Sequence, residues 1–168
     1  MKFFLFLLAS VFSLQVYAQQ LPPVRFSWGY EFFPENFERV CSENALSSAD
    51  VFCDRYVRYI QFDQTLSNDR RRELAGSGVE LAGYIYPATY ELVIPVSFNL
   101  KTLDQSGAVS VMPVAPGWKL SRSLREPPFG SWAVHGDWID INIRIYRGMR
   151  WNEVLSACTA SGMILIEE

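Results

Sequence analysis

The chain of 168 residues has a single histidine, three cysteines and no excess of positive charge, with 15 lysines and arginines against 18 acidic residues. One histidine excludes a His-rich zinc site within one chain, and any Ser-His-Asp machinery would have to use His135. A net charge of -3 provides no field for holding phosphate backbones, so nucleic acid is not an expected partner. The 49% hydrophobic content excludes a disordered chain, and the length favours one domain or two very small ones.

The one long apolar run lies at the amino terminus. Lys2 precedes an apolar stretch over residues 3–16, and Val16-Tyr17-Ala18 closes it with a small residue. This pattern is typical of a secretory signal peptide over residues 1–18, with cleavage between Ala18 and Gln19. The alternative is an uncleaved membrane anchor, but such a helix would rise only about 21 Å against a bilayer core of roughly 30 Å. We therefore expect a protein that is secreted or held in the cell envelope, with no membrane contact after cleavage.

Export would place the cysteines in an oxidising compartment. Cys41 and Cys53 flank a polar loop, and we expect them to form a disulfide that stabilises the fold by roughly 2–3 kcal/mol. Cys158 then has no disulfide partner within the chain. It falls at the apolar spacing of a helix with Val154 and Leu155, which favours a buried thiol over a catalytic nucleophile.

The mature chain divides into a lead-in, one regular unit, a linker and part of another unit. Residues 19–55 are rich in aromatic residues and contain the expected disulfide loop; their prolines and lack of period predict an extended segment that packs its rings onto something else. Residues 56–115 follow the order β-α-β-β-α-β, with strands over residues 56–62, 79–84, 90–94 and 108–112 and helices over residues 68–75 and 99–105. This order predicts an α+β, ferredoxin-like unit with a four-stranded antiparallel sheet and both helices on one face. The other face is expected to stay open, and an open face that carries aromatic residues usually has a partner.

A proline-rich linker over residues 116–136 leads to a second pattern over residues 137–168. Residues 138–146 alternate cleanly and predict a strand, residues 151–160 predict a helix that Gly162 stops, and residues 163–166 begin another strand. Setting Gly78 on Gly162 aligns the two patterns as an internal repeat. The sequence thus predicts a second, incomplete and truncated βαβ unit. We expect this unit either to be only marginally stable on its own or to dock on the first unit.

The sequence contains few candidates for catalytic or binding residues. His135 lies near Asp137 and Asp140, but no serine sits in a nucleophile-turn pattern, so we expect a surface or turn histidine. The run Arg70-Arg71-Arg72 faces acidic neighbours on a helix, and Gly76-Ser77-Gly78 follows a helix, so we interpret these as a solvated face and a helix stop. The sequence therefore assigns no catalytic, cofactor-binding or metal-ligating residue, and no cofactor is expected.

Three segments of the regular unit carry a family resemblance. Residues 59–63 read YIQFD, residues 66–81 run through a helix into a Gly-Val strand, and residues 84–90 read YIYPATY. Together they resemble the amino-terminal prodomain region of secreted bacterial subtilisin-like serine peptidases, the subtilases. Residues 118–121 and 132–136 resemble the connection to a second such unit, so the resemblance covers about residues 26–168.

The resemblance implies a prodomain that assists the folding of a peptidase domain, in cis or in trans, and occupies its cleft until processing. It carries over no catalytic residue, because the Asp-Thr/Ser-Gly, His-Gly-Thr-His and Gly-Thr-Ser-Met motifs do not occur in this sequence. Our leading hypothesis is a secreted, non-catalytic prodomain-like module, as a truncated frame or the amino-terminal piece of a larger peptidase. Two alternatives stay open: a stand-alone subtilase inhibitor, and an envelope or surface interaction module whose aromatic residues 26–37 bind a partner.

Overall fold

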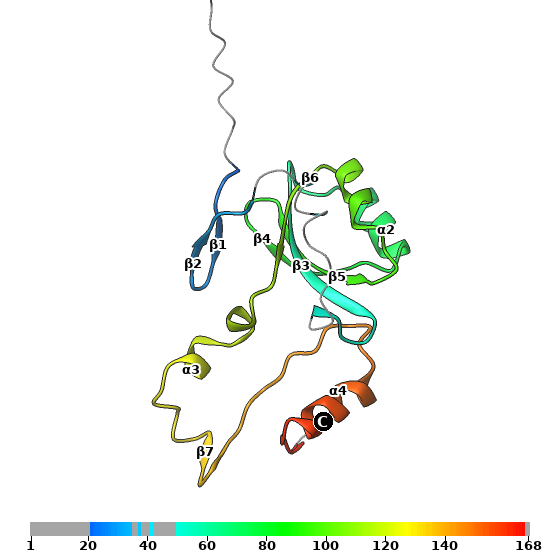
Figure 1. Ribbon diagram of the computed structural model, residues 1–168. Helices are drawn as coiled ribbons and strands as arrows, with labels where there is room; N and C mark the ends of the chain where they lie inside the picture. Colours follow the sequence, from blue (N-terminus) through cyan, green and yellow to red (C-terminus); the bar gives the residue numbers. More distant parts are fainter. Residues whose placement is uncertain (1–20, 35–36, 38–40, 42–49, 167–168) are drawn as a thin grey trace, which may run out of the picture.

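The structure is a computed structural model that describes residues 21–34, 37, 41 and 50–166 (Figure 1). The expected signal peptide, with Ala18 and Gln19 at its cleavage site, lies outside these residues. Within the part that the structure describes, no helix combines the length and apolar character needed to cross a membrane. The described chain is a mixed α+β structure that contains one four-stranded antiparallel sheet and two small two-stranded sheets.

The four-stranded sheet holds β3 (Arg55–Phe62), β4 (Glu80–Ile85), β5 (Thr89–Pro95) and β6 (Ala108–Pro113). Its order is β4-β5-β3-β6, and each neighbouring pair is antiparallel. These strands confirm the four strands predicted from the sequence, with bounds that differ by a residue or two. β3 lies in the middle of the sheet and has buried side chains on both faces, which explains its dense run of aromatic and β-branched residues.

Two helices cover one face of the sheet, as predicted. They are α2 (Asn68–Gly76) and the 3-10 helix η2 (Leu100–Ser106), which Figure 1 shows on the same side of the strands. Leu74 of α2 and Leu103 of η2 are buried against Ile60, Leu92 and Val111 of the sheet. This layer is the main hydrophobic core.

The ends of both helices follow from local chemistry. The Ser67 side chain accepts a hydrogen bond from the Arg70 amide at 3.3 Å and so caps the start of α2. Gly107 ends η2 in the left-handed conformation with φ of 81°. A Cβ atom at Gly107 would collide with the Asp63 carboxylate, so the position requires glycine for two separate reasons.

The second face of the sheet is not open, which corrects the prediction from the sequence. The lead-in folds into a hairpin of β1 (Val24–Phe26) and β2 (Gly29–Glu31) that buries Val24, Phe26 and Phe33 against Tyr59. Trp118 of the 3-10 helix η3 (Pro116–Lys119) completes this second cluster, with its ring 5.8 Å from that of Phe26. The prediction failed because the partner of this face is the chain's own lead-in, which carries no periodic pattern.

Two buried polar side chains bind the lead-in to the sheet. Gln61 on β3 donates from Nε2 to the Pro22 carbonyl at 3.0 Å, and the neighbouring Ser110 on β6 donates from its hydroxyl to the Pro34 carbonyl. Both are almost fully buried, and the Gln61 Oε1 atom has no hydrogen-bond partner within the described structure. These two polar residues of the sheet thus hold the lead-in on both sides of the β1–β2 hairpin.

The predicted second βαβ unit forms only in part. The region contains α3 (Arg122–Arg125), the short strands β7 (Val134–His135) and β8 (Trp138–Ile139), and α4 (Trp151–Ala160), so the predicted helix is confirmed. The strand predicted over residues 138–146 is limited to β8, and residues 163–166 form no strand. A strand needs a neighbour for its backbone hydrogen bonds, and within the described residues only β7 pairs with this run.

Candidate functional site

The single histidine lies on an exposed hairpin. His135 pairs with Asp140 across the β7–β8 turn, with His135 Nε2 3.0 Å from Asp140 Oδ2, and both side chains are exposed. This agrees with the turn or surface histidine expected from the sequence. Among the described residues, no group of three or more histidine, cysteine and acidic side chains is placed to hold a metal ion.

The expected disulfide between Cys41 and Cys53 is not formed, since both residues are free thiols in the structure. Cys41 packs on the main core, where burial raises the pKa of its thiol and Lys101 and Asp104 are its charged neighbours. Cys53 lies in the turn before β3 and contacts the start of α4, where burial and a hydrogen bond to Glu153 raise the pKa of its thiol. The two thiols thus face different parts of the molecule. Cys158, expected to be buried, is a half-buried free thiol on α4.

The basic run on α2 serves the fold. Arg70 and Arg72 form exposed ion pairs with Glu73 and Asp69, as expected for a solvated face. Arg71 instead donates to the Leu66 carbonyl and to the Tyr90 hydroxyl, both at 3.1 Å. The Gly76-Ser77-Gly78 segment ends α2, as predicted.

Two exposed tyrosines mark the hairpin between β4 and β5, here called the tyrosine hairpin (residues 84–90). Tyr84 is 51% exposed and Tyr86 is 78% exposed, whereas Tyr90 of the same motif is buried. Tyr90 anchors the hairpin to the core, because its hydroxyl accepts a hydrogen bond from the Leu66 amide at 3.1 Å. The motif therefore contains one structural tyrosine and two that present their rings to solvent, as aromatic contact residues do.

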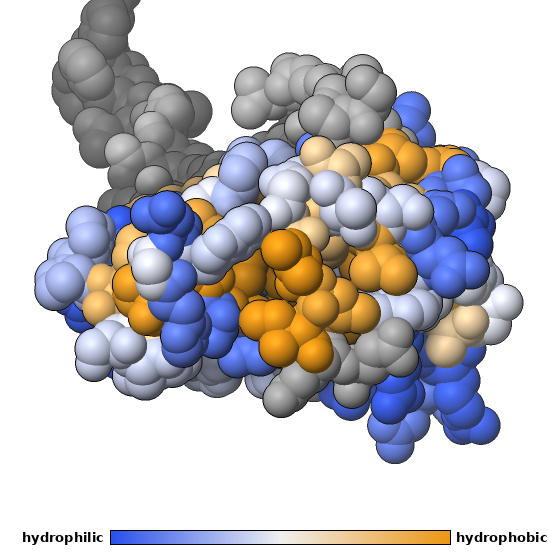
Figure 2. All heavy atoms as spheres, turned by 90° about the horizontal axis from the view of Figure 1, so that it is seen from below, coloured by the Kyte–Doolittle hydropathy of each residue, from blue (hydrophilic) through white to orange (hydrophobic). Residues whose placement is uncertain are grey.

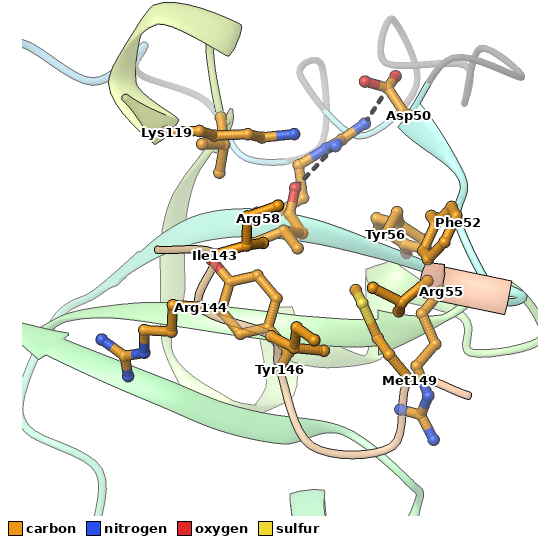
Figure 3. Close-up of a pocket in the computed structure, with 14 residues that line it drawn as sticks. Asp50, Phe52, Arg55, Tyr56, Arg58, Lys119, Ile143, Arg144, Tyr146 and Met149 are labelled. Carbon is orange, nitrogen blue, oxygen red and sulfur yellow. Dashed lines mark hydrogen bonds and ion pairs between the residues drawn. The ribbon is translucent and has the colours of Figure 1, made fainter. Parts of the chain in front are cut away.

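A cavity of about 260 Å³ lies between β3 and the segment that leads into α4. Figure 3 shows Tyr146 in its middle, Lys119 and Arg58 on one side and Met149 on the other. The Tyr146 hydroxyl donates to Glu91 Oε1, and burial together with this carboxylate raises the pKa of Tyr146. Burial, followed by the charge of Glu91, also raises the pKa of the nearby Tyr59 to about 12. Both phenols are therefore held in their neutral form.

The cations around this cavity do not converge on a common point. Arg58, whose side chain is only 4% exposed, pairs with Asp50 at 3.3 Å and lies over the Tyr56 ring. Arg55 donates to the Gly78 carbonyl at 2.9 Å, and Figure 3 shows the Arg144 guanidinium directed away from Arg58. The residues that line the cavity include no serine, cysteine or histidine among those that the structure describes. The lining thus contains no Ser-His or Cys-His pair within the described residues, and its side chains fill the space between the sheet and the segment that leads into α4.

The region after β6 presents many apolar side chains to solvent. Figure 2, which views the molecule from below, shows apolar atoms gathered in the middle of this face. The exposed large residues of this region are Leu120, Phe129, Trp132, Val134, Trp138, Ile141, Ile143, Trp151, Met163, Ile164, Leu165 and Ile166. An apolar surface of this extent is typical of an interaction site. The sequence signal for part of it was the clean alternation of residues 138–146, here called the extended segment.

These features define an α+β protein with an antiparallel sheet, an exposed tyrosine hairpin and an exposed apolar carboxyl-terminal region. The chain belongs to the family described as "Domain of unknown function (DUF8729)", which its residues 25–115 match. The matched range runs from β1 to just past β6, so it includes the lead-in hairpin together with the four-stranded sheet. No curated protein and no solved structure matches the chain.

Proposed function

We propose that this protein is a secreted, non-catalytic module that binds the catalytic domain of a subtilisin-like serine peptidase, as the prodomains of that family do. In this role it assists the folding of the peptidase and occupies its cleft. The proposal joins the resemblance carried by residues 59–63, 66–81 and 84–90 to the way in which these residues are arranged in space. The signal peptide predicted over residues 1–18 supports a role outside the cytoplasm.

The observation that carries the proposal is the order of the strands. β3, α2, β4, β5, η2 and β6 follow one another along the chain, and the sheet order is β4-β5-β3-β6. A split βαβ unit of the ferredoxin-like type has this connectivity, with both crossovers on one face. This connectivity supports a ferredoxin-like fold for residues 56–115, the fold that the prodomain resemblance implies.

The contact surface in this proposal is the tyrosine hairpin. The sheet face opposite the helices is filled by Phe26, Phe33 and Trp118 of the chain itself, so a peptidase cannot dock there without displacing the lead-in. Tyr84 and Tyr86 belong to the motif that carries the resemblance, and they remain exposed. Exposed tyrosines at an interface bury large rings at little cost in conformational entropy.

The same burial weakens the third hypothesis from the sequence, in which aromatic residues 26–37 bind a partner. Phe26, Phe33 and Phe37 are buried in the two cores, so these three rings serve the fold, whereas Tyr30 and Phe32 remain exposed. The stand-alone inhibitor differs from the prodomain-like module only in whether the peptidase is a separate chain. Both require the same docking surface.

The proposal is tested by binding of the purified protein, residues 19–168, to immobilised catalytic domains of secreted bacterial subtilisin-like peptidases. We expect binding, and we expect the Tyr84→Ala/Tyr86→Ala variant to bind at least about tenfold more weakly. Tyr30→Ala is the matched control, because Tyr30 is 63% exposed on β2 and lies outside the hairpin. Absence of binding across the panel would refute the proposed function, and equal losses in both variants would refute the assigned surface.

A further inference from the structure

The extended segment has a sequence that is symmetric in character about Asn142. Isoleucines occupy positions 139, 141, 143 and 145, opposite charges occupy positions 140 and 144, and aromatic residues occupy positions 138 and 146. We propose that two copies of this chain pair through their extended segments as antiparallel strands, with a twofold axis at Asn142. This inference is independent of the proposed function, because it uses a different surface.

The extended segment has a free edge for such pairing. Its first two residues pair with β7, but no backbone hydrogen bond within the described structure involves residues 141–145. Figure 1 shows this stretch as a single trace that runs from the hairpin at β7 toward α4, and Ile143, Arg144 and Ile145 line the cavity beside β3 without a backbone hydrogen bond to it. Trp138 is 58% exposed and Ile143 is 50% exposed. An unpaired edge with exposed β-branched residues is a template for another strand.

The charges select both the partner and the direction. In an antiparallel pair centred on Asn142, Asp140 of each copy lies opposite Arg144 of the other. Ile141 then lies opposite Ile143, and Trp138 lies opposite Tyr146, so each cross-strand pair is of a favourable kind. A parallel pair in the same register would instead place Asp140 beside Asp140 and Arg144 beside Arg144. The sequence therefore favours a second copy in the antiparallel direction, which gives a closed twofold dimer.

Both ends of the extended segment are already fixed in the single chain. Asp140 is held by His135 through Oδ2, which leaves its Oδ1 atom for an arginine of the other copy. At the other end, the Tyr146 hydroxyl donates to Glu91 and the Arg147 amide donates to Glu80 at 3.2 Å. Pairing therefore adds a strand to a segment that is anchored at both ends, which lowers the entropy cost of association.

Charge reversal gives a specific test. Asp140→Arg places like charges opposite each other twice in the dimer, and so does Arg144→Asp. We expect each variant alone to weaken the dimer by on the order of tenfold or more, measured by sedimentation equilibrium of the purified chain. An equimolar mixture of the two variants restores both opposite-charge pairs in a heterodimer, so it should dimerise as the wild-type protein does. Circular dichroism of each variant checks that the fold is kept.

A cross-link tests the register. Asn142 would face its own copy across the axis, where Cα atoms of opposed residues are about 4.5–5.5 Å apart, within disulfide range. Asn142→Cys should therefore form a disulfide-linked dimer on mild oxidation, whereas Ser156→Cys, at an exposed position on α4, should not.

The proposal is overturned if the wild-type chain sediments as a monomer at about 100 μM, a range in which weak strand pairs associate. It is also overturned if a dimer forms but the two charge variants and their mixture behave alike, because another surface then forms the contact. Protection of the extended segment by a peptidase domain, with no dimer, would assign that surface to the peptidase instead.

Discussion

The environment of Tyr59 shows at a single residue that the second face of the sheet is covered. It lies on β3 against the rings of Phe26 and Trp118, at 5.0 and 6.2 Å, and only 7% of it is exposed. Burial and then the charge of Glu91 raise its pKa to about 12. In the unfolded chain the same phenol ionises near pH 10. The folded state therefore favours the neutral phenol over the phenolate more strongly than the unfolded state does.

This shift predicts a loss of stability at alkaline pH. Tyr59 stabilises the fold fully below pH 10, and this contribution is lost as the pH rises from about 10 to about 12, because the unfolded chain then binds fewer protons than the folded one. The Tyr59→Phe variant should lose less unfolding free energy over this range than the wild-type protein. Urea unfolding at a series of pH values measures the slope, and the two proteins should run parallel below pH 9. Equal slopes above pH 10 would contradict the assignment.

At the scale of elements, the predictable and unpredictable parts separate clearly. The strands and helices of residues 56–112 were predicted because local features specify them: runs of aromatic and β-branched residues for the strands, and Ser67 and Gly107 at the ends of the helices. The β1–β2 hairpin was not predicted, since it owes its place to contacts with Tyr59 and to the hydrogen bonds of Gln61 and Ser110, far away in the chain. The extended segment was predicted as a strand because its apolar and polar residues alternate. Alternation fixes the two faces of a strand but does not supply a neighbouring strand, so only β8 forms.

The helix α4 depends on a small number of contacts. Val154 is its one buried residue within the described structure, and Arg150 fixes its start by pairing with Asp54 at 3.3 Å and with Glu153. A helix of ten residues is not stable in isolation in water. Its order therefore depends on the docking of Val154 beside β3.

This dependence predicts local unfolding in a single variant. Val154→Asp should raise amide hydrogen exchange throughout residues 151–160 and leave β3 and β5 protected, because it buries an unpaired carboxylate only at the α4 contact. Ser156→Asp, at an exposed position of the same helix, is the control and should keep the wild-type pattern. Exchange that rises in the sheet as well would mean that α4 belongs to the main cooperative unit.

At the scale of the whole molecule, the candidate site followed from the sequence only in part. The motif at residues 84–90 was identified from the sequence, but its division into a buried Tyr90 and exposed Tyr84 and Tyr86 required the hairpin geometry. The cavity under Tyr146 had no sequence signal, because Arg58, Lys119 and Tyr146 come from three distant segments. Of the apolar surface after β6, only the extended segment had a sequence signal, the alternation of residues 138–146.

The proposed function requires that this chain bind a peptidase and have no peptidase activity of its own. The most direct measurement is the rate at which a secreted subtilisin-like peptidase hydrolyses a chromogenic peptide, with and without the purified chain at about 10 μM. The account predicts that at least one peptidase of this class is slowed, that the Tyr84→Ala/Tyr86→Ala variant slows it less, and that the chain alone hydrolyses nothing. Undiminished hydrolysis by every peptidase of the class, or hydrolysis by the chain alone, would contradict it.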